Sequence, residues 1–181
     1  MDRAPSIAAI AIMGRHNNPL HIALFPATGS TESQYAAERD QLEYHMMLNS
    51  CLDIFEARIP TKAIGHDFGL LHALDERIAM YGWLLNTGVK LVIVVDMEGR
   101  QARNAEEAKL GMLGLRGSDL TPAFQALQQA YVSLLRNPFY VPDEHDPKTA
   151  QEKGNMQINS PKFLKEVDRI GNVWSPGITA I

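Results

Sequence analysis

Cysteine is almost absent from this chain, and so are the signals of export and membrane insertion. Cys51 is the single cysteine, which excludes an internal disulfide, and no Asn-x-Ser/Thr sequon is present. No apolar run approaches the roughly 20 residues that span a bilayer. Residues 6–13 are apolar, but Asp2 and Pro5 precede them, so a first strand is favoured over a signal peptide. We therefore expect a cytosolic protein.

Positive charge is also sparse and scattered. The chain has 17 Lys and Arg residues against 21 Asp and Glu residues, a net charge of −4, and no dense basic block. Such a chain is not expected to follow a phosphate backbone or to be drawn strongly to anionic lipid. With 181 residues, 45% of them hydrophobic, the composition is that of a globular protein with one core. We expect one domain over residues 1–181.

Hydrophobic periodicity predicts two strands and a helix in the first third of the chain. Residues 6–13 are apolar at both parities, which is typical of a strand covered on both faces. Residues 20–25 form the returning strand of a hairpin. A helix is expected over residues 40–58, ended by Pro60, because its apolar side chains recur at helical spacing: Tyr44, Met47, Leu48, Cys51, Leu52 and Phe55.

Three further strands are expected over residues 68–73, 77–85 and 89–95, the last two joined by the turn Asn86-Thr87-Gly88. A second helix begins near Thr121, a plausible N-cap, and ends at Asn137-Pro138. Ser160-Pro161 opens a last helix that runs to about residue 170. Residues 97–117 and 143–157 are glycine-rich or polar, and we expect them to be mobile loop insertions.

The element order is therefore β-β-α-β-β-β-α-α. Two hairpin-type runs separated by a helix predict a mainly antiparallel five-stranded sheet with helices on both faces. Covering both faces accounts for the strands that lack polar alternation. The fold class predicted is a three-layer α+β domain.

No combination of residues points to catalysis, a cofactor or a bound metal. Asp67-Phe68-Gly69 lacks the companion motifs of a kinase, and the glycines of residues 111–117 are not spaced as a nucleotide loop. The run Asp143-Glu144-His145-Asp146 contains metal-binding side chains, but a solvated acidic loop is favoured. Cys51 lies on an apolar helix stripe, where a buried structural thiol is favoured over a nucleophile.

Asp53, Phe139 and Tyr140 are the candidate partner-contact residues. Asp53 borders the buried stripe of the first helix, either as a solvated residue or as a polar contact in an interface. Phe139 and Tyr140 directly follow the second helix and either fold back on the sheet or anchor a partner. Folding back is favoured for both aromatic side chains.

Four blocks of the sequence follow one another in a fairly specific order. They are Tyr44-His45-Met46-Met47 with Leu52-Asp53, Tyr81-Gly82-x-Leu84 with residues 89–96, residues 124–142 ending in Asn137-Pro138-Phe139-Tyr140-x-Pro142, and Ile158-x-Ser160-x-x-Phe163 with Val167. In this order they resemble the sedlin-type small subunits of the TRAPP vesicle-tethering complex, most closely the subunit 2-like branch. The resemblance extends over residues 6 to 170, with residues 97–115 and 143–157 longer than the usual loops.

The resemblance implies a longin-like fold, with one helix on one face of the sheet and two on the other. It also implies a non-catalytic subunit that supports assembly of a complex acting in ER-to-Golgi and Golgi transport. Partners would be other TRAPP subunits, either small longin-like or palmitoylated-type subunits and a large scaffold subunit. A Rab GTPase and the Golgi membrane would be reached only through the complex. In the family, the aspartate matching Asp53 lies near a partner-contact surface.

Two alternatives remain open at this point. One is a longin-domain trafficking regulator of the SNARE or clathrin-adaptor small-chain type, and a SNARE would need a further heptad helix. The other is a small enzyme or ligand-binding domain, which would need a set of polar residues converging on a pocket. The sequence offers no such set.

Overall fold

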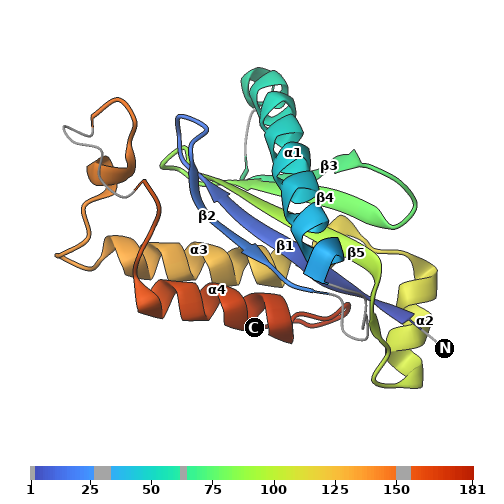
Figure 1. The fold of residues 1–181 in the computed structure, drawn as a ribbon. Helices are drawn as coiled ribbons and strands as arrows, with labels where there is room; N and C mark the ends of the chain where they lie inside the picture. Colours follow the sequence, from blue (N-terminus) through green and yellow to red (C-terminus); the bar gives the residue numbers. More distant parts are fainter. Residues whose placement is uncertain (1–2, 27–33, 62–64, 150–155) are drawn as a thin grey trace.

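The protein is built on a five-stranded antiparallel sheet, with strand order β2-β1-β5-β4-β3 (Figure 1). The computed structural model describes residues 3–26, 34–61, 65–149 and 156–181. The strands are β1 (Arg3–Met13), β2 (Pro19–Leu24), β3 (Asp67–Ala73), β4 (Ile78–Leu84) and β5 (Lys90–Gln101). The predicted antiparallel α+β architecture is confirmed.

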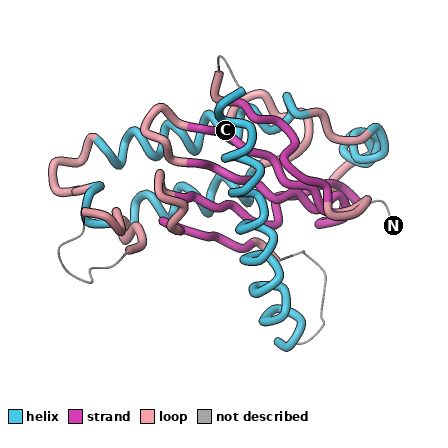
Figure 2. The backbone as a smooth tube through the Cα atoms, turned by 90° about the horizontal axis from the view of Figure 1, so that it is seen from above, coloured by secondary structure: helices cyan, strands magenta, loops and turns pink. Residues whose placement is uncertain are grey.

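Helices cover both faces of the sheet. α1 (Gln34–Arg58) packs on one face, and α3 (Thr121–Leu135) and α4 (Pro161–Val173) pack on the other. Seen from above, α1 runs across the strands and one of its ends extends past the sheet (Figure 2). The expected arrangement, with one helix on one face of the sheet and two on the other, is confirmed. The buried residues of α1 are those of the predicted stripe: Met47, Leu48, Cys51, Leu52 and Phe55.

β1 and β5 lie side by side inside the sheet, which explains why each strand carries apolar side chains on both of its faces over residues 7–13 and 91–95. Ile10 pairs with Ile93, and both side chains belong to the core under α3 and α4. Their neighbours Ala11 and Val92 form the next pair and belong to the core under α1. A strand in this position buries the side chains on both of its faces, because each face of the sheet carries its own helix layer.

The helix ends fall close to the sequence-based positions, except at the start of α1. α1 begins at Gln34, six residues before the predicted start. α3 begins at Thr121, so that Leu120 rather than Thr121 is the N-cap, and ends at Leu135, close to Pro138. α4 follows Ser160, as predicted, and continues to Val173.

The expectation that residues 97–117 lack regular structure is wrong. β5 continues to Gln101, where it pairs with the start of β1, and α2 (Ala105–Leu113) and a 3₁₀ turn (Gly117–Leu120) follow. Asn104 starts α2, because its Oδ1 accepts a hydrogen bond of 2.8 Å from the backbone N–H of Glu107. The Glu107 carboxylate also pairs with Arg100 at 3.1 Å, which attaches α2 to β5.

Both outer strands of the sheet have part of their free backbone edge occupied. On β3, Arg58 from the end of α1 donates to the carbonyl oxygen of Leu70 at 2.8 Å, and the pairing of β3 with β4 shifts register twice. On β2, the carbonyl oxygen of Leu20 accepts a hydrogen bond of 2.8 Å from the backbone N–H of Ile158. The sheet is therefore closed at these points by the chain's own residues.

Candidate partner-contact surfaces

The outward side of α1 carries the first candidate surface. Leu42, Met46, Asn49 and Asp53 follow one another at spacings of four, three and four residues, so they lie in one row along the helix. All four are exposed, and Leu42 and Met46 each keep 67% of their surface accessible. We refer to these four residues as the α1 ridge. An apolar pair at one end and a carboxylate at the other make this ridge suitable for a protein partner.

Asp53 lies on the side of α1 that faces away from the sheet, not at the border of the buried stripe. Its neighbours Leu52 and Phe55 are buried, whereas Asp53 itself is exposed. Among the residues that the structure describes, none donates a hydrogen bond to its carboxylate. The carboxylate is therefore hydrated and available to a cation on another molecule.

Phe139 and Tyr140 have opposite environments, although the sequence treats them alike. Both belong to a turn after α3, in which the backbone N–H of Phe139 donates to Oδ1 of Asn137 at 3.1 Å and that of Tyr140 donates to the Asn137 carbonyl at 3.0 Å. Phe139 is 92% exposed, so the expectation that it folds back is wrong. Pro138 and the two hydrogen bonds hold this aromatic ring outward before any partner arrives.

Tyr140 does fold back, as expected. Its ring stacks on His145 with centroids 5.4 Å apart, and it packs against the core under α3 and α4. Burial raises the pKa of the Tyr140 hydroxyl above its usual range. Tyr140 is therefore a structural residue of this turn, and Phe139 is the residue that a partner could contact.

The segment that supports Tyr140 is attached to the turn between β1 and β2. His145 and Asp146 are buried, and Asp146 accepts a hydrogen bond of 2.8 Å from Nε of Arg15. Asn18 donates to the carbonyl oxygen of His145 at 2.8 Å. A hydrogen bond of 2.9 Å from the backbone N–H of Lys148, together with the Arg15 guanidinium, lowers the pKa of Asp146.

The favoured reading of Asp143-Glu144-His145-Asp146 as a solvated loop is therefore wrong for its last two residues. Residues 150–155, which also belong to the predicted mobile loop, lie outside the described residues.

Comparison with known proteins decides the family. A family model described as sedlin matches residues 12–172. The chain belongs to the sedlin family. The resemblance drawn from the four sequence blocks is thereby confirmed, including its closeness to the subunit 2-like branch.

Relatives of this sedlin-family chain are similar over most of their length. A trafficking protein particle complex subunit 2-like protein from Dictyostelium discoideum is 30% identical over 167 residues, which cover 91% of this chain and 95% of the relative. Proteins of the same name from Mus musculus and Bos taurus are 28% and 26% identical over 141 residues, covering 75% of this chain and 84% of each relative.

The single thiol of this sedlin-family chain lies in the apolar core under α1. Cys51 is fully buried, its Sγ lies 3.2 Å from Sδ of Met80, and burial raises its pKa to about 12. Among the described residues, no three His, Cys, Asp or Glu side chains are grouped to hold a metal ion. Within the same residues, no helix is both long and apolar enough to cross a membrane.

The two candidate surfaces are not brought together. The α1 ridge lies on the helix that covers one face of the sheet, and Phe139 follows α3, which covers the other face (Figure 1). Sequence reasoning identified Asp53 and Phe139 but missed Leu42 and Met46. The sequence carries a signal for them, because both side chains are apolar and lie outside the buried stripe of the helix, which indicates a contact surface.

Proposed function

We propose that this chain is a non-catalytic subunit of a TRAPP vesicle-tethering complex. The main support for this proposal is the length of the match, because the similarity covers 95% of a relative that is named as a subunit of that complex. Whatever that relative contributes therefore depends on the part that the two chains share. The sedlin match over residues 12–172 supports the same conclusion.

The proposed role is to support assembly of the complex in ER-to-Golgi and Golgi transport. Its direct partners are other TRAPP subunits, either small longin-like or palmitoylated-type subunits and a large scaffold subunit. A Rab GTPase is engaged, and exchange is catalysed, only by the assembled complex. Membrane association is peripheral and occurs through the complex, with no nucleic acid and no cofactor involved.

The α1 ridge, with Asp53, is the contact we assign first. Leu42 and Met46 supply apolar area that is already exposed, and Asp53 supplies a single charge at the end of that area. A complementary partner presents an apolar patch with an Arg or Lys at one side. Such a pair gains specificity from the charge and affinity from the apolar contact. The Phe139 turn is a second, separate contact.

The test is affinity purification of the tagged full-length chain from its native cells, with the TRAPP subunits quantified by mass spectrometry. We expect several TRAPP subunits to be recovered with the wild type. Asp53→Tyr should reduce recovery of at least one subunit about tenfold, the loss that about 1.4 kcal/mol of binding free energy produces. Glu106→Tyr, which places the same ring on exposed α2, is the matched control and should retain all subunits.

Two results would count against the proposal. Recovery of clathrin-adaptor subunits without TRAPP subunits would overturn the assignment to TRAPP. Unchanged recovery with Asp53→Tyr would overturn the role of the α1 ridge and leave the complex membership intact. Circular dichroism of both variants checks that the fold persists, which we expect because Asp53 is exposed.

A further inference from the structure

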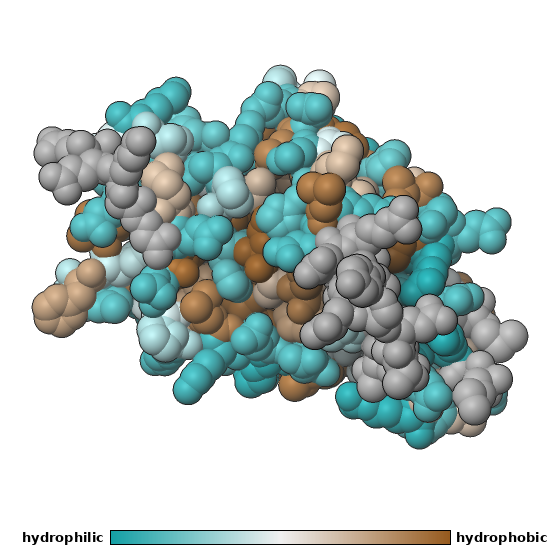
Figure 3. All heavy atoms as spheres, viewed as in Figure 1, coloured by the Kyte–Doolittle hydropathy of each residue, from teal (hydrophilic) through white to brown (hydrophobic). Residues whose placement is uncertain are grey.

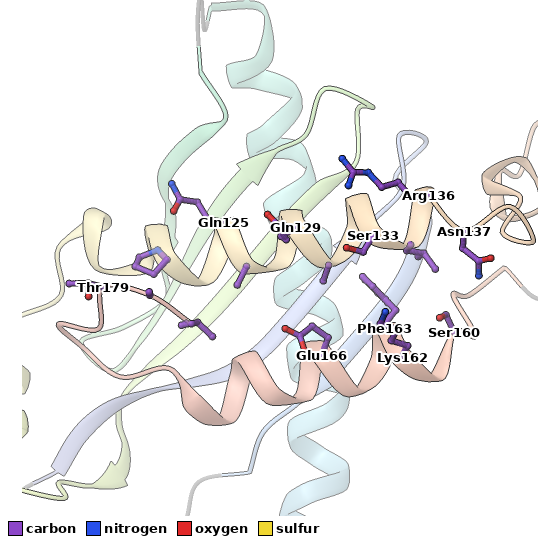
Figure 4. A pocket seen from close by; sticks show the side chains of 16 residues that line it. Gln125, Gln129, Ser133, Arg136, Asn137, Ser160, Lys162, Phe163, Glu166 and Thr179 are labelled. Carbon is purple, nitrogen blue, oxygen red and sulfur yellow. The ribbon is translucent and has the colours of Figure 1, made fainter.

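A groove of about 850 Å³ runs along the outer surface between α3 and α4. Figure 4 shows its two walls, with side chains of α3 along one side and Lys162, Phe163 and Glu166 of α4 along the other. In the view of Figure 1, apolar side chains gather over these two helices and polar ones surround them (Figure 3). The groove is distinct from both the α1 ridge and the Phe139 side chain.

α3 contributes a row of small side chains to the floor of the groove. Pro122, Ala126, Ala130 and Ser133 line it at spacings of four, four and three residues, and the polar side chains of Gln125 and Gln129 line it beside this row. The large side chains of α3 point into the core instead: Phe124, Leu127, Tyr131 and Leu134. A row of small residues lets the backbone of another helix approach closely.

The chain itself closes one end of the groove. After α4, Trp174 donates from Nε1 to the carbonyl oxygen of Asp119 at 3.0 Å, which returns the chain to the start of α3. Thr179 and Ile181 then line the groove, and Thr179 lies toward the Gln125 end of α3 (Figure 4). Arg136 and Lys162 lie at the opposite end (Figure 4). The row from Pro122 to Ser133 is about 16 Å long at 1.5 Å per residue.

Charge is distributed unevenly along this groove. Arg136 and Lys162 are exposed at the end of the groove opposite Thr179, and within the described ranges neither forms an ion pair. The acidic residue of the groove, Glu166, is paired with Arg169, whose Nε lies 3.0 Å from the Glu166 carboxylate, and it also interacts electrostatically with Lys162. Among the described residues, this end of the groove therefore carries an excess of positive charge that favours an acidic group on a partner.

We propose that the groove between α3 and α4 binds an amphipathic helix of another TRAPP subunit, with an Asp or Glu of that helix beside Arg136 and Lys162. Both walls are helices, whose backbone groups are already hydrogen-bonded, so an extended peptide would find no strand edge to pair with. A helix satisfies its own backbone and needs only an apolar stripe and the complementary charge. This inference rests on the proposed function, because it takes the partner to be a TRAPP subunit.

The experiment uses the same affinity purification of the full chain with two groove variants. Ala130→Trp fills the groove, and Val132→Trp places the same ring at an exposed position of α3 outside it. The double variant Arg136→Glu with Lys162→Glu reverses the charge, and Lys165→Glu is its control on α4. We expect both groove variants to lose one and the same TRAPP subunit at least about tenfold. Both controls should retain it.

A photo-reactive residue in place of Ser133 then identifies the occupant. We expect it to cross-link to a helical segment of the lost subunit that carries an acidic residue, and a cationic substitution of that residue to restore binding to the charge-reversed variant. A cross-link to a second copy of this chain, or to an extended segment, would overturn the proposal.

The outcomes separate this inference from the proposed function. If the wild type recovers TRAPP subunits and both groove variants retain them all, the groove proposal is overturned and the function stands. If the wild type recovers no TRAPP subunit, the proposed function fails and the inference fails with it. If Ala130→Trp does not fold, as judged by circular dichroism, the charge-reversed variant decides, because its two positions are exposed.

Discussion

Nε of Arg15 donates a hydrogen bond of 2.8 Å to Oδ2 of Asp146, across 131 positions of sequence. The carboxylate of Asp146 is buried, whereas Arg15 is half-exposed. This contact joins the turn between β1 and β2 to the segment that carries His145, and it places Tyr140 on a fixed support. Residues that look like two unrelated polar loops in the sequence therefore form one structural unit.

The Arg15–Asp146 contact predicts a pH dependence of stability. The folded-state pKa of Asp146 lies below its unfolded value, so the stabilisation is present above about pH 4 and is lost as the pH falls through the folded-state pKa. Asp146→Asn should lower the melting temperature at neutral pH and reduce the further fall on acidification. Glu144→Gln, at an exposed neighbour, should follow the wild type. Thermal denaturation at several pH values measures both, and parallel curves for all three proteins would contradict the prediction.

Cys51 should be unreactive in the folded protein. With its pKa raised to about 12, only about one thiol in ten thousand is ionised near pH 8. A thiol reagent such as DTNB should therefore label the native chain very slowly and the chain in guanidinium chloride quickly. The chain has one cysteine, so the signal is unambiguous. Rapid labelling without denaturant would show that α1 separates readily from the sheet.

Gly82→Ala should destabilise the fold by about 1–3 kcal/mol, the usual effect of overfilling a packed core. A Cβ at this position would lie 2.5 Å from Cζ of Phe55 and 2.7 Å from Cδ1 of Leu71, so these two buried side chains would have to shift. Gly117→Ala is the matched control, since no atom lies within 4 Å of its added Cβ. Urea denaturation measures the free energy of unfolding of each variant. Equal values for the two would refute the close approach of α1 to β4.

Phe139→Ala and Tyr140→Ala should differ in stability although the residues are adjacent. Phe139 is 92% exposed, so its removal should change the free energy of unfolding by less than about 0.5 kcal/mol. Tyr140 stacks on His145 and packs against the core, and its removal should cost about 1–3 kcal/mol. Denaturant titration of the two variants tests this. A large loss for Phe139→Ala would mean that its ring is covered in solution.

The sheet and its helix layers could be predicted because their signals are local. The unbroken apolar run over residues 91–95 predicts a strand covered on both faces, and β5 lies between β1 and β4 under helices on each side. The stripe through Cys51 and Phe55 predicts the face that α1 buries. Periodicity is sufficient for such elements, because the side-chain pattern alone determines which face is buried.

α2 was not predicted, because the glycines of residues 97–117 favour a loop, although the segment also carries a helix start signal. Asn104 followed by Ala105, Glu106 and Glu107 is an N-cap with acidic residues in the first turn, which favours a helix. The order of residues 143–149 could not be predicted, since Arg15 and Asn18 lie more than a hundred residues away in the sequence. Phe139 and Tyr140 belong to one residue class, and only the geometry of their turn separates them.

The guanidinium of Arg58 has a consequence for how this chain can assemble. It occupies the carbonyl oxygen of Leu70 on the outer side of β3, where a strand from another molecule would have to bond. An incoming strand would first have to displace a cation that is tethered to the end of α1, and then match a strand whose register shifts twice. Edge-to-edge association, in which further chains would extend the sheet, is therefore disfavoured at β3. The helix layers, whose backbone groups are already hydrogen-bonded, offer no such template, so a contact there depends on side chains and does not propagate from chain to chain.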